Sequence, residues 1–374
     1  MTAFFFRRSV EKAFQLDEQP PGLTLDARKP LDVNPPYITS AVDDVMYIVS
    51  EMLDKVLHTS QKAVVASTVP TISRVLSSDF IGMIQRKMRD DSYPKAAVQG
   101  APPPEHVSIT FFVLMNNLDV AIDYIRRIVK DRIGSSPTGI DAGVNGEDIS
   151  IALIKLFPLD QDAFYVRNTL QGMESSFTGK AAELIGDGIY VAFKNIVKPR
   201  LRPILADAFR DVDYQMTQEG LALSHSANVH EGGPPSNSDG MVQDVFRHGW
   251  DMLTKQMVHI LTERNVDKLL TLMASYLSEV LEKRIWSYYG RLDSLGGVRL
   301  ERDIASIVNV VVRGGKYRLR ASFARCTQIC VVMNMENDEW DSLSSPSPAT
   351  DDDTQWQLDV DERSRARTMI KGVF

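Results

Sequence analysis

Residues 291–336 decide the fold more than any other stretch, and they read RLDSLGGVRLERDIASIVNVVVRGGKYRLRASFARCTQICVVMNME. Two blocks with helical spacing of apolar residues flank Leu295-Gly296-Gly297, which is predicted to form a turn. The second block carries a basic face over an apolar face. The stretch holds no paired nucleophile and base, no metal-ligand cluster and no phosphate-binding loop. We therefore expect a surface for binding or tethering rather than a catalytic centre.

Apolar residues at helical spacing recur along most of the remaining chain. Between Val42 and Leu57 they stand at the i, i+3, i+4 and i+7 positions that place them on one face of a helix. No run of alternating β-branched residues is long enough to require a strand, and Val308–Val312, the nearest, lies within a helical period. The other ranges with the helical period are 61–88, 109–132, 148–172, 179–214 and 242–289.

The predicted fold class is all-α, with antiparallel helical bundles stacked into an elongated rod. Residues 1–222 are expected to form one or more bundles and 242–341 a C-terminal bundle. Between them, 223–241 is rich in Gly, Pro, Ser and Asn without apolar periodicity, and is predicted to be a flexible loop at a domain boundary. An acidic Ser/Pro-rich segment, 342–355, is predicted to be disordered. Residues 356–374 are expected to add a short helix to the C-terminal bundle.

Composition excludes several classes of protein. The chain has 374 residues and a net charge of −7, so bulk attraction to nucleic acid is not expected. No apolar window approaches the length of about 20 residues that spans a bilayer, so no transmembrane segment is expected. The two cysteines, Cys326 and Cys330, lie four residues apart inside an apolar helical pattern and are predicted to be buried free thiols.

Candidates for catalytic or cofactor chemistry are weak. None of the six histidines has partners at metal-ligand spacing, so no metal is predicted. Gly314-Gly315-Lys316 resembles the end of a phosphate loop but lacks its first glycine, its Ser or Thr and its preceding strand. No GxSxG elbow is present. The chain is therefore predicted to be neither an enzyme nor a cofactor-binding protein.

A basic cluster is the strongest candidate for a functional surface. It consists of Arg313, Lys316, Arg318, Arg320 and Arg325, with no acidic residue between them. Three interpretations remain open: an ordinary solvated helix face, a protein-docking surface, and a nucleic-acid site that lacks interleaved aromatic residues.

We further hypothesise that Arg318, Arg320 and Arg325 contact a partner or form salt bridges with acids such as Asp338 and Glu339. Gly314 and Gly315 are unusual inside a helix and are expected to mark a kink or a close helix–helix approach. The complete set of candidate interaction or structural residues is Leu295, Gly296, Gly297, Arg313, Lys316, Arg318, Arg320, Arg325 and Glu336.

The N-terminal residues, MTAFFFRRSVEKAFQLDE, do not form a secretion signal, because the apolar run is too short and the arginines follow it. Phenylalanines that begin directly after Met1 are typical of a helix cut from a longer protein. We expect the chain to be a fragment or a partial gene product.

Several motifs, in order along nearly the whole chain, resemble the C-terminal half of subunit 4 of the conserved oligomeric Golgi complex. They are FFFRRSVEKAFQLDE, YITSAVDDVMYIVSEML, FFVLMNNLDVAIDYI around Asn116-Asn117, VKPRLRPIL, SLGGVRLERDIASI, ASFARCTQICVVMNME, and Trp356-Gln357-Leu358. Each motif is weak alone, and their order makes the resemblance specific. The loop at 223–241, the acidic tail and Gly314-Gly315 depart from the family's pattern.

The resemblance implies a non-catalytic subunit of a vesicle-tethering complex that acts in intra-Golgi retrograde transport and Golgi organisation. It also implies contacts with the other subunits and with SNAREs and their regulators, and peripheral association with the cytosolic face of the Golgi membrane through those partners. The family's N-terminal coiled-coil portion, through which its subunits assemble, is not in this chain. Helical periodicity alone is equally compatible with a scaffold or adaptor unrelated to Golgi traffic.

Overall fold

The computed structural model describes residues 2–96, 101–134, 151–210, 212–215, 241–344 and 356–370. Throughout these ranges the regular structure is helical, and its only β-type feature is an isolated bridge between Leu292 and Ile370. The all-α, helical-bundle prediction is confirmed. The predicted loop at 223–241 lies outside the described residues except for Met241, which begins a helix. Residues 342–344, predicted to be disordered, instead end helix α14 (Asn337–Ser344), and the rest of that segment is outside the described ranges.

The chain folds into two compact units. Unit 1 comprises residues 1–196 and 255–268, and unit 2 comprises residues 197–254 and 269–374. The division thus differs from the boundary predicted at 223–241, which followed composition. The units are defined by which helices share a core, and the chain passes between them at three places.

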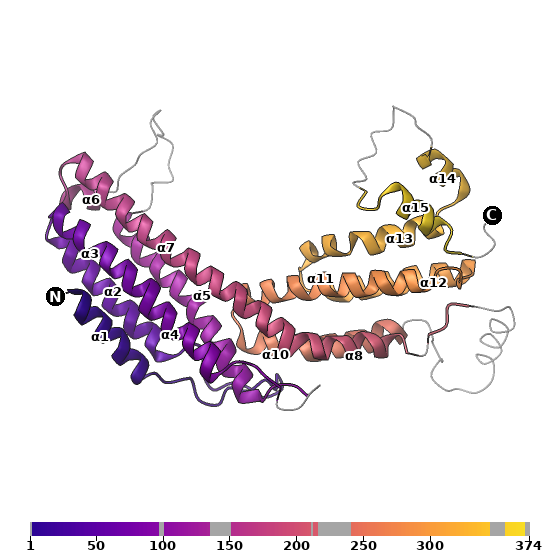
Figure 1. Ribbon diagram of the computed structural model, residues 1–374, viewed down its shortest axis with the longest axis horizontal. Helices are drawn as coiled ribbons and strands as arrows, with labels where there is room; N and C mark the ends of the chain where they lie inside the picture. The colour runs from indigo at the N-terminus through magenta and orange to yellow at the C-terminus, as the bar shows by residue number, and fades with distance from the viewer. Residues whose placement is uncertain are drawn as a thin grey trace. The chain divides into compact units, whose positions relative to one another are not determined.

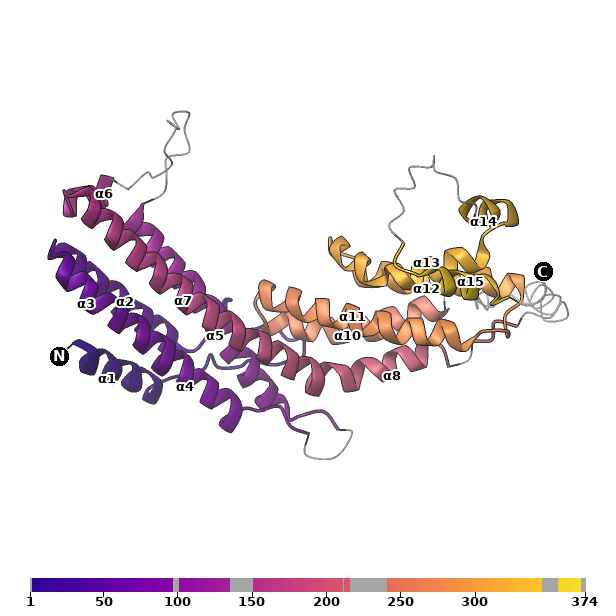
Figure 2. The same ribbon diagram turned by 45° about the horizontal axis from the view of Figure 1, so that its top comes forward.

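Unit 1 is a bundle of long antiparallel helices, and Figures 1 and 2 both show α2, α3, α5 and α7 side by side. Their buried faces are the apolar stripes that the sequence predicted, for example Val42, Val45, Val49 and Leu53 of α2. The end of α10 and the start of α11 also belong to unit 1. The remaining helical segments of unit 1 are α1 (Thr2–Gln15), α2 (Ser40–His58), α3 (Lys62–Val75), η1 (Leu76–Phe80), α4 (Ile81–Arg86), η2 (Lys87–Asp91), α5 (Glu105–Ile133), α6 (Ile151–Leu156) and α7 (Asp160–Ala192).

Helix α5 is the central helix of unit 1. By length and composition it is apolar enough to cross a membrane, contrary to the sequence-based expectation that no segment would be. However, 78% of its most apolar 18-residue window is buried inside the unit. A core helix surrounded by other helices has the same composition, so the finding is weak support for a membrane span.

Unit 2 begins where a π-helical turn, η3 (Phe193–Val197), interrupts the long helix that started at Asp160. Helix α8 restarts at Lys198 with Pro199 in its first turn, where a missing N–H costs nothing. Helix α8 packs against α10, since Gly249 lies beside Ile204, and against α11, since Lys198 lies over the Tyr276 ring. The segments of unit 2 are α8 (Lys198–Ala208), α10 (Met241–Ile260) to Thr254, α11 (Glu263–Ser287) from Leu269, α12 (Ser294–Val312), η4 (Tyr317–Phe323), α13 (Ala324–Asn334), α14 and α15 (Val360–Arg367).

Three local predictions for residues 291–336 need correction. Leu295-Gly296-Gly297 is not a turn between helices but the first turn of α12, which is capped by the Asp293 side chain. Gly314 and Gly315 do not lie inside a helix: they follow the end of α12 with φ of 74° and 84°, and no atom lies within 4 Å of a Cβ built on either. They form a left-handed turn that glycine adopts without strain, and not a close helix contact.

The second of the two helical blocks predicted within residues 291–336 is also divided in the structure. A 3-10 segment, η4, precedes α13, which ends at Asn334. Both cysteines are in α13, buried and free, as predicted. Burial raises the pKa of the Cys326 thiol to about 11, so this thiol is not reactive near neutral pH.

Candidate functional sites

The first turn of α12 packs so closely against other residues of unit 2 that Gly296 and Gly297 have no space for a side chain. A Cβ on Gly296 would come within 1.8 Å of the Tyr214 carbonyl oxygen. A Cβ on Gly297 would meet Asn334 Oδ1 and Ile370 Cδ1, both at 2.7 Å. These two candidate residues therefore act by allowing close approach rather than by forming a turn. Leu295, beside them, is 53% exposed and takes no part in this contact.

A buried hydrogen bond supports the same contact. The Tyr214 hydroxyl donates to Asp303 Oδ2 of α12 at 2.9 Å, and both side chains are buried. Burial, and then the negative charge of Asp303, raise the pKa of Tyr214 well above its ordinary value. The phenol thus stays protonated and keeps donating. Its neighbour Arg299 lies over the Tyr214 ring.

The predicted basic cluster is divided among several partners. Arg313 donates to Asp251 of α10 at 2.7 Å, and Arg320 donates to Asn309 of α12 at 2.9 Å. Lys316 and Arg318 also have partners. Tyr317, between them, is 71% exposed. Glu336, the last candidate, is exposed after the end of α13, and its carbonyl accepts from Trp340 N at 3.0 Å.

Arg325 differs from the other basic residues because it is enclosed by two acids. Its guanidinium donates to Glu282 of α11 at 2.8 Å and to Glu362 of α15 at 2.5 Å. It also donates to the Gln357 carbonyl at 3.0 Å. The acids are not the predicted Asp338 and Glu339. One planar cation thereby connects α11, α13 and α15, and its hydrogen bond lowers the pKa of Glu362.

We predict that this network makes unit 2 sensitive to acid. Because the folded-state pKa of Glu362 lies below its ordinary value near 4.5, the pair stabilises the fold above that pH and stops doing so as the pH falls through the lower, folded value. Arg325→Gln should lower the free energy of unfolding at pH 7 by about 2 kcal/mol, since two carboxylates then face each other. It should also make the free energy of unfolding fall less steeply as the pH decreases below 4.5.

Urea unfolding followed by tryptophan fluorescence measures this, because Trp250, Trp286, Trp340 and Trp356 are the chain's four tryptophans and all belong to unit 2. Arg313→Gln is the matched control, since its ion pair is more exposed and should contribute less than about 1 kcal/mol. Equal effects of the two substitutions would contradict the special role of Arg325.

A second site, which the sequence-based candidate set missed, surrounds Asn116 of α5. This asparagine is fully buried. Its Nδ2 donates to the carbonyls of Tyr37 at 3.1 Å and Ile260 at 2.8 Å, and its Oδ1 accepts from Thr262 N at 3.0 Å. One amide thus holds the segment before α2 and the connection between α10 and α11. The signal was present: two asparagines interrupt an otherwise apolar helical run.

Two neighbours reinforce this anchor. Asn117 Oδ1 accepts from Thr39 N at 2.9 Å, and its Nδ2 donates to Thr39 Oγ1 at 2.9 Å. Arg264, in the first turn of α11, pairs with Asp119 at 2.9 Å and with Asp123. The α10–α11 connection is therefore fixed to α5 by polar contacts on both sides of Thr262.

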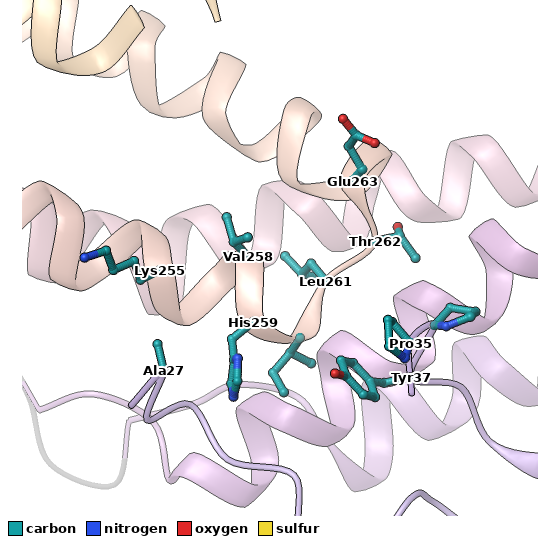
Figure 3. Close-up of a pocket in the computed structure, with 11 residues that line it drawn as sticks. Ala27, Pro35, Tyr37, Lys255, Val258, His259, Leu261, Thr262 and Glu263 are labelled. Carbon is teal, nitrogen blue, oxygen red and sulfur yellow. The ribbon is translucent and has the colours of Figure 1, made fainter. Parts of the chain in front are cut away.

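A hollow of about 660 Å³ opens beside the anchor, within unit 1 (Figure 3). The segment before α2 contributes Pro35 and Tyr37 to its lining, the last turns of α10 contribute Val258 and His259, and the connection to α11 contributes Leu261. In the part of the chain that the structure describes, no three His, Cys, Asp or Glu side chains are grouped to hold a metal.

Comparison with known proteins assigns the family. A family model described as "Conserved oligomeric Golgi complex subunit 4, C-terminal" matches residues 111–365, and another described as "COG4 transport protein, middle alpha-helical bundle" matches residues 1–88. Curated relatives named conserved oligomeric Golgi complex subunit 4 include proteins from Arabidopsis thaliana (24% identical), Saccharomyces cerevisiae (22%) and Homo sapiens (22%).

The matches cover most of this chain but less than half of each relative. They include 92%, 97% and 92% of this chain, and 41%, 48% and 42% of the Arabidopsis, yeast and human proteins, respectively. The first of these family models alone matches more than half of the chain, from the second turn of α5 to α15. The chain belongs to the family of subunit 4 of the conserved oligomeric Golgi complex.

Proposed function

We propose that this chain is the C-terminal portion of a non-catalytic subunit of a Golgi vesicle-tethering complex. The observation that carries the proposal is the family match, which extends over both helical units. The arrangement of side chains supports a role in protein contacts. The contacts described around Asn116, Gly296 and Arg325 connect separate segments of the fold to one another. Such contacts fix the shape of a surface and do not assemble reactive groups.

The proposed activity is intra-Golgi retrograde transport and Golgi organisation. The proposed partners are the other subunits of the complex, together with SNAREs and their regulators. Association with the cytosolic face of the Golgi membrane would then be peripheral and would follow from those partners. The chain spans less than half the length of the curated relatives it matches.

Charge reversal in the basic cluster tests whether it docks a partner. Arg318→Glu with Arg320→Glu should reduce co-purification of the other complex subunits or SNAREs by tenfold or more, because both residues are exposed. The thermal melting of the chain should change by only a few degrees. A tagged chain expressed in eukaryotic cells, followed by affinity purification and quantitative mass spectrometry, provides the measurement.

The matched control is Lys180→Glu in α7 with Lys194→Glu in η3, which reverses the same number of charges at two exposed positions. Unchanged capture and unchanged melting in the arginine variant would reject a docking role for the cluster. Recovery of unrelated partners by the wild-type chain would favour an adaptor outside Golgi traffic.

A further inference from the structure

We propose that the hollow beside Asn116 is a docking groove for a short peptide segment that carries an apolar side chain next to an acidic one. The groove consists of Ala27, Pro35, Pro36, Tyr37, Lys255, Val258, His259, Ile260, Leu261, Thr262 and Glu263. All of these residues belong to unit 1. The inference does not depend on the proposed function, because it concerns a surface whose shape and chemistry are set by this chain alone.

The first argument is that the walls of the groove are fixed before any ligand arrives. Asn116 holds Tyr37 and Ile260 through their carbonyls and Thr262 through its N–H. Tyr37 comes from one wall, and Ile260 and Thr262 come from the other. A preformed site binds without the entropic cost of ordering its own backbone.

The second argument is that apolar surface is left uncovered in the groove. Val258 lines it and is 58% exposed, although Ile260 and Leu261, which closely follow it in the chain, are buried. Pro35, Pro36 and Tyr37 add apolar surface on the facing wall, as Figure 3 shows for Pro35 and Tyr37. The volume of about 660 Å³ suits one or two apolar side chains. Their burial would contribute about 25 cal/mol per Å² of surface removed from water.

The third argument concerns polarity and identifies the acidic part of the ligand. Lys255 and His259 line the α10 side of the groove, and Glu263 lies at the start of α11. His259 Nε2 is buried, and no described residue offers it a hydrogen-bond partner. That nitrogen is closed off from the groove, whereas Lys255 is exposed, and a carboxylate of the peptide would pair with the Lys255 ammonium. A basic peptide would instead bring like charge beside the Lys255 ammonium.

The charged residues beside the groove do not change which side of the groove is cationic. A second hollow of about 510 Å³ shares Pro36, Thr262 and Glu263 with the groove. Its Arg264 is already paired with Asp119 and Asp123, so that side offers no excess of positive charge. The cationic part of the groove is therefore the Lys255 side, which sets the direction in which the peptide would lie.

Selection of a phage-displayed library of random dodecapeptides on the intact 374-residue chain tests the proposal. We expect enrichment of sequences with Leu, Ile, Phe or Met within about three positions of Asp or Glu. A synthetic peptide from the selection should bind the chain with micromolar affinity by fluorescence polarisation. Val258→Glu and Lys255→Glu should each weaken binding at least about tenfold.

Met252→Glu is the matched control, because Met252 is on the same helix, is 48% exposed and lies outside the groove. It should leave peptide binding unchanged. Circular dichroism should show that all three variants keep their helix content, which is expected since the substituted side chains are exposed.

Three results would overturn the proposal. One is no enrichment above background, and another is enrichment that Val258→Glu does not affect. The third is enrichment of apolar peptides without an acid, or of basic ones. Vesicles of phosphatidylcholine with and without phosphatidylserine provide a separate arm. Binding only to anionic vesicles, lost in Lys255→Glu, would identify a lipid surface and reject a peptide groove.

Discussion

Replacing Gly296 with alanine is expected to destabilise unit 2 by about 4 kcal/mol and to lower its melting temperature by roughly 10 °C. A Cβ at this position would lie 1.8 Å from the Tyr214 carbonyl oxygen and 2.8 Å from the carbonyl carbon. Both are backbone atoms, so no side-chain rotation relieves the overlap. Either α12 or the segment around Tyr214 must move, which also disturbs the hydrogen bond from Tyr214 to Asp303.

Tryptophan fluorescence during urea or thermal unfolding reports this effect on unit 2 selectively. Gly186→Ala in α7 is the control, because no atom lies within 4 Å of the added Cβ, and it is followed by circular dichroism at 222 nm since all four tryptophans are in unit 2. That substitution should stabilise its helix by up to about 1 kcal/mol, in line with the difference in helix propensity. A neutral or stabilising result for Gly296→Ala would mean that α12 does not approach Tyr214 as described.

Replacing Asn116 with leucine is expected to cost unit 1 about 4 kcal/mol. The substitution keeps the branched shape and the number of heavy atoms but removes every hydrogen bond of the amide. It takes this partner from the buried Ile260 carbonyl and from the part-buried Thr262 N–H. The Tyr37 carbonyl is only partly buried and should recover part of its loss through water. Hydrogen exchange should increase first in residues 255–268, which the amide holds to α5.

Circular dichroism at 222 nm gives the stability, and hydrogen exchange with mass spectrometry gives the location. Asn168→Leu in α7 makes the same chemical change on an exposed face, and should alter stability by less than about 0.5 kcal/mol. Exchange that rises uniformly over unit 1, rather than first in 255–268, would argue against a local anchor.

The sequence was sufficient for the fold class, because helical periodicity is a local property. The buried face of α2 can be read directly from Val42, Val45 and Val49. The division into units could not be predicted, since composition reveals a polar loop but not which helices share a core. The short return of residues 255–268 to unit 1 has no compositional signal at all.

The candidate sites show the same limit. Charge density drew attention to Arg325, but its partners Glu282 and Glu362 are 43 and 37 residues away in the chain. Gly296 and Gly297 indicated that the backbone has an unusual role there. The prediction of a turn was wrong because glycines that allow close approach within a helix cannot be told apart, in sequence, from glycines that form a turn. The polar pair in the apolar run of α5 was a usable signal for the anchor.

The three crossings between units have a consequence for biosynthesis. A ribosome delivers residues 197–254 of unit 2 before residues 255–268 of unit 1. Unit 1 therefore lacks part of its core until the nascent chain has passed residue 268. Unit 2 lacks part of its core until α12, α13 and α15 have also been synthesised. Neither half can be completed before the other has been started. Exposed apolar helices are thus present during translation, and chaperone demand should be greatest over that interval.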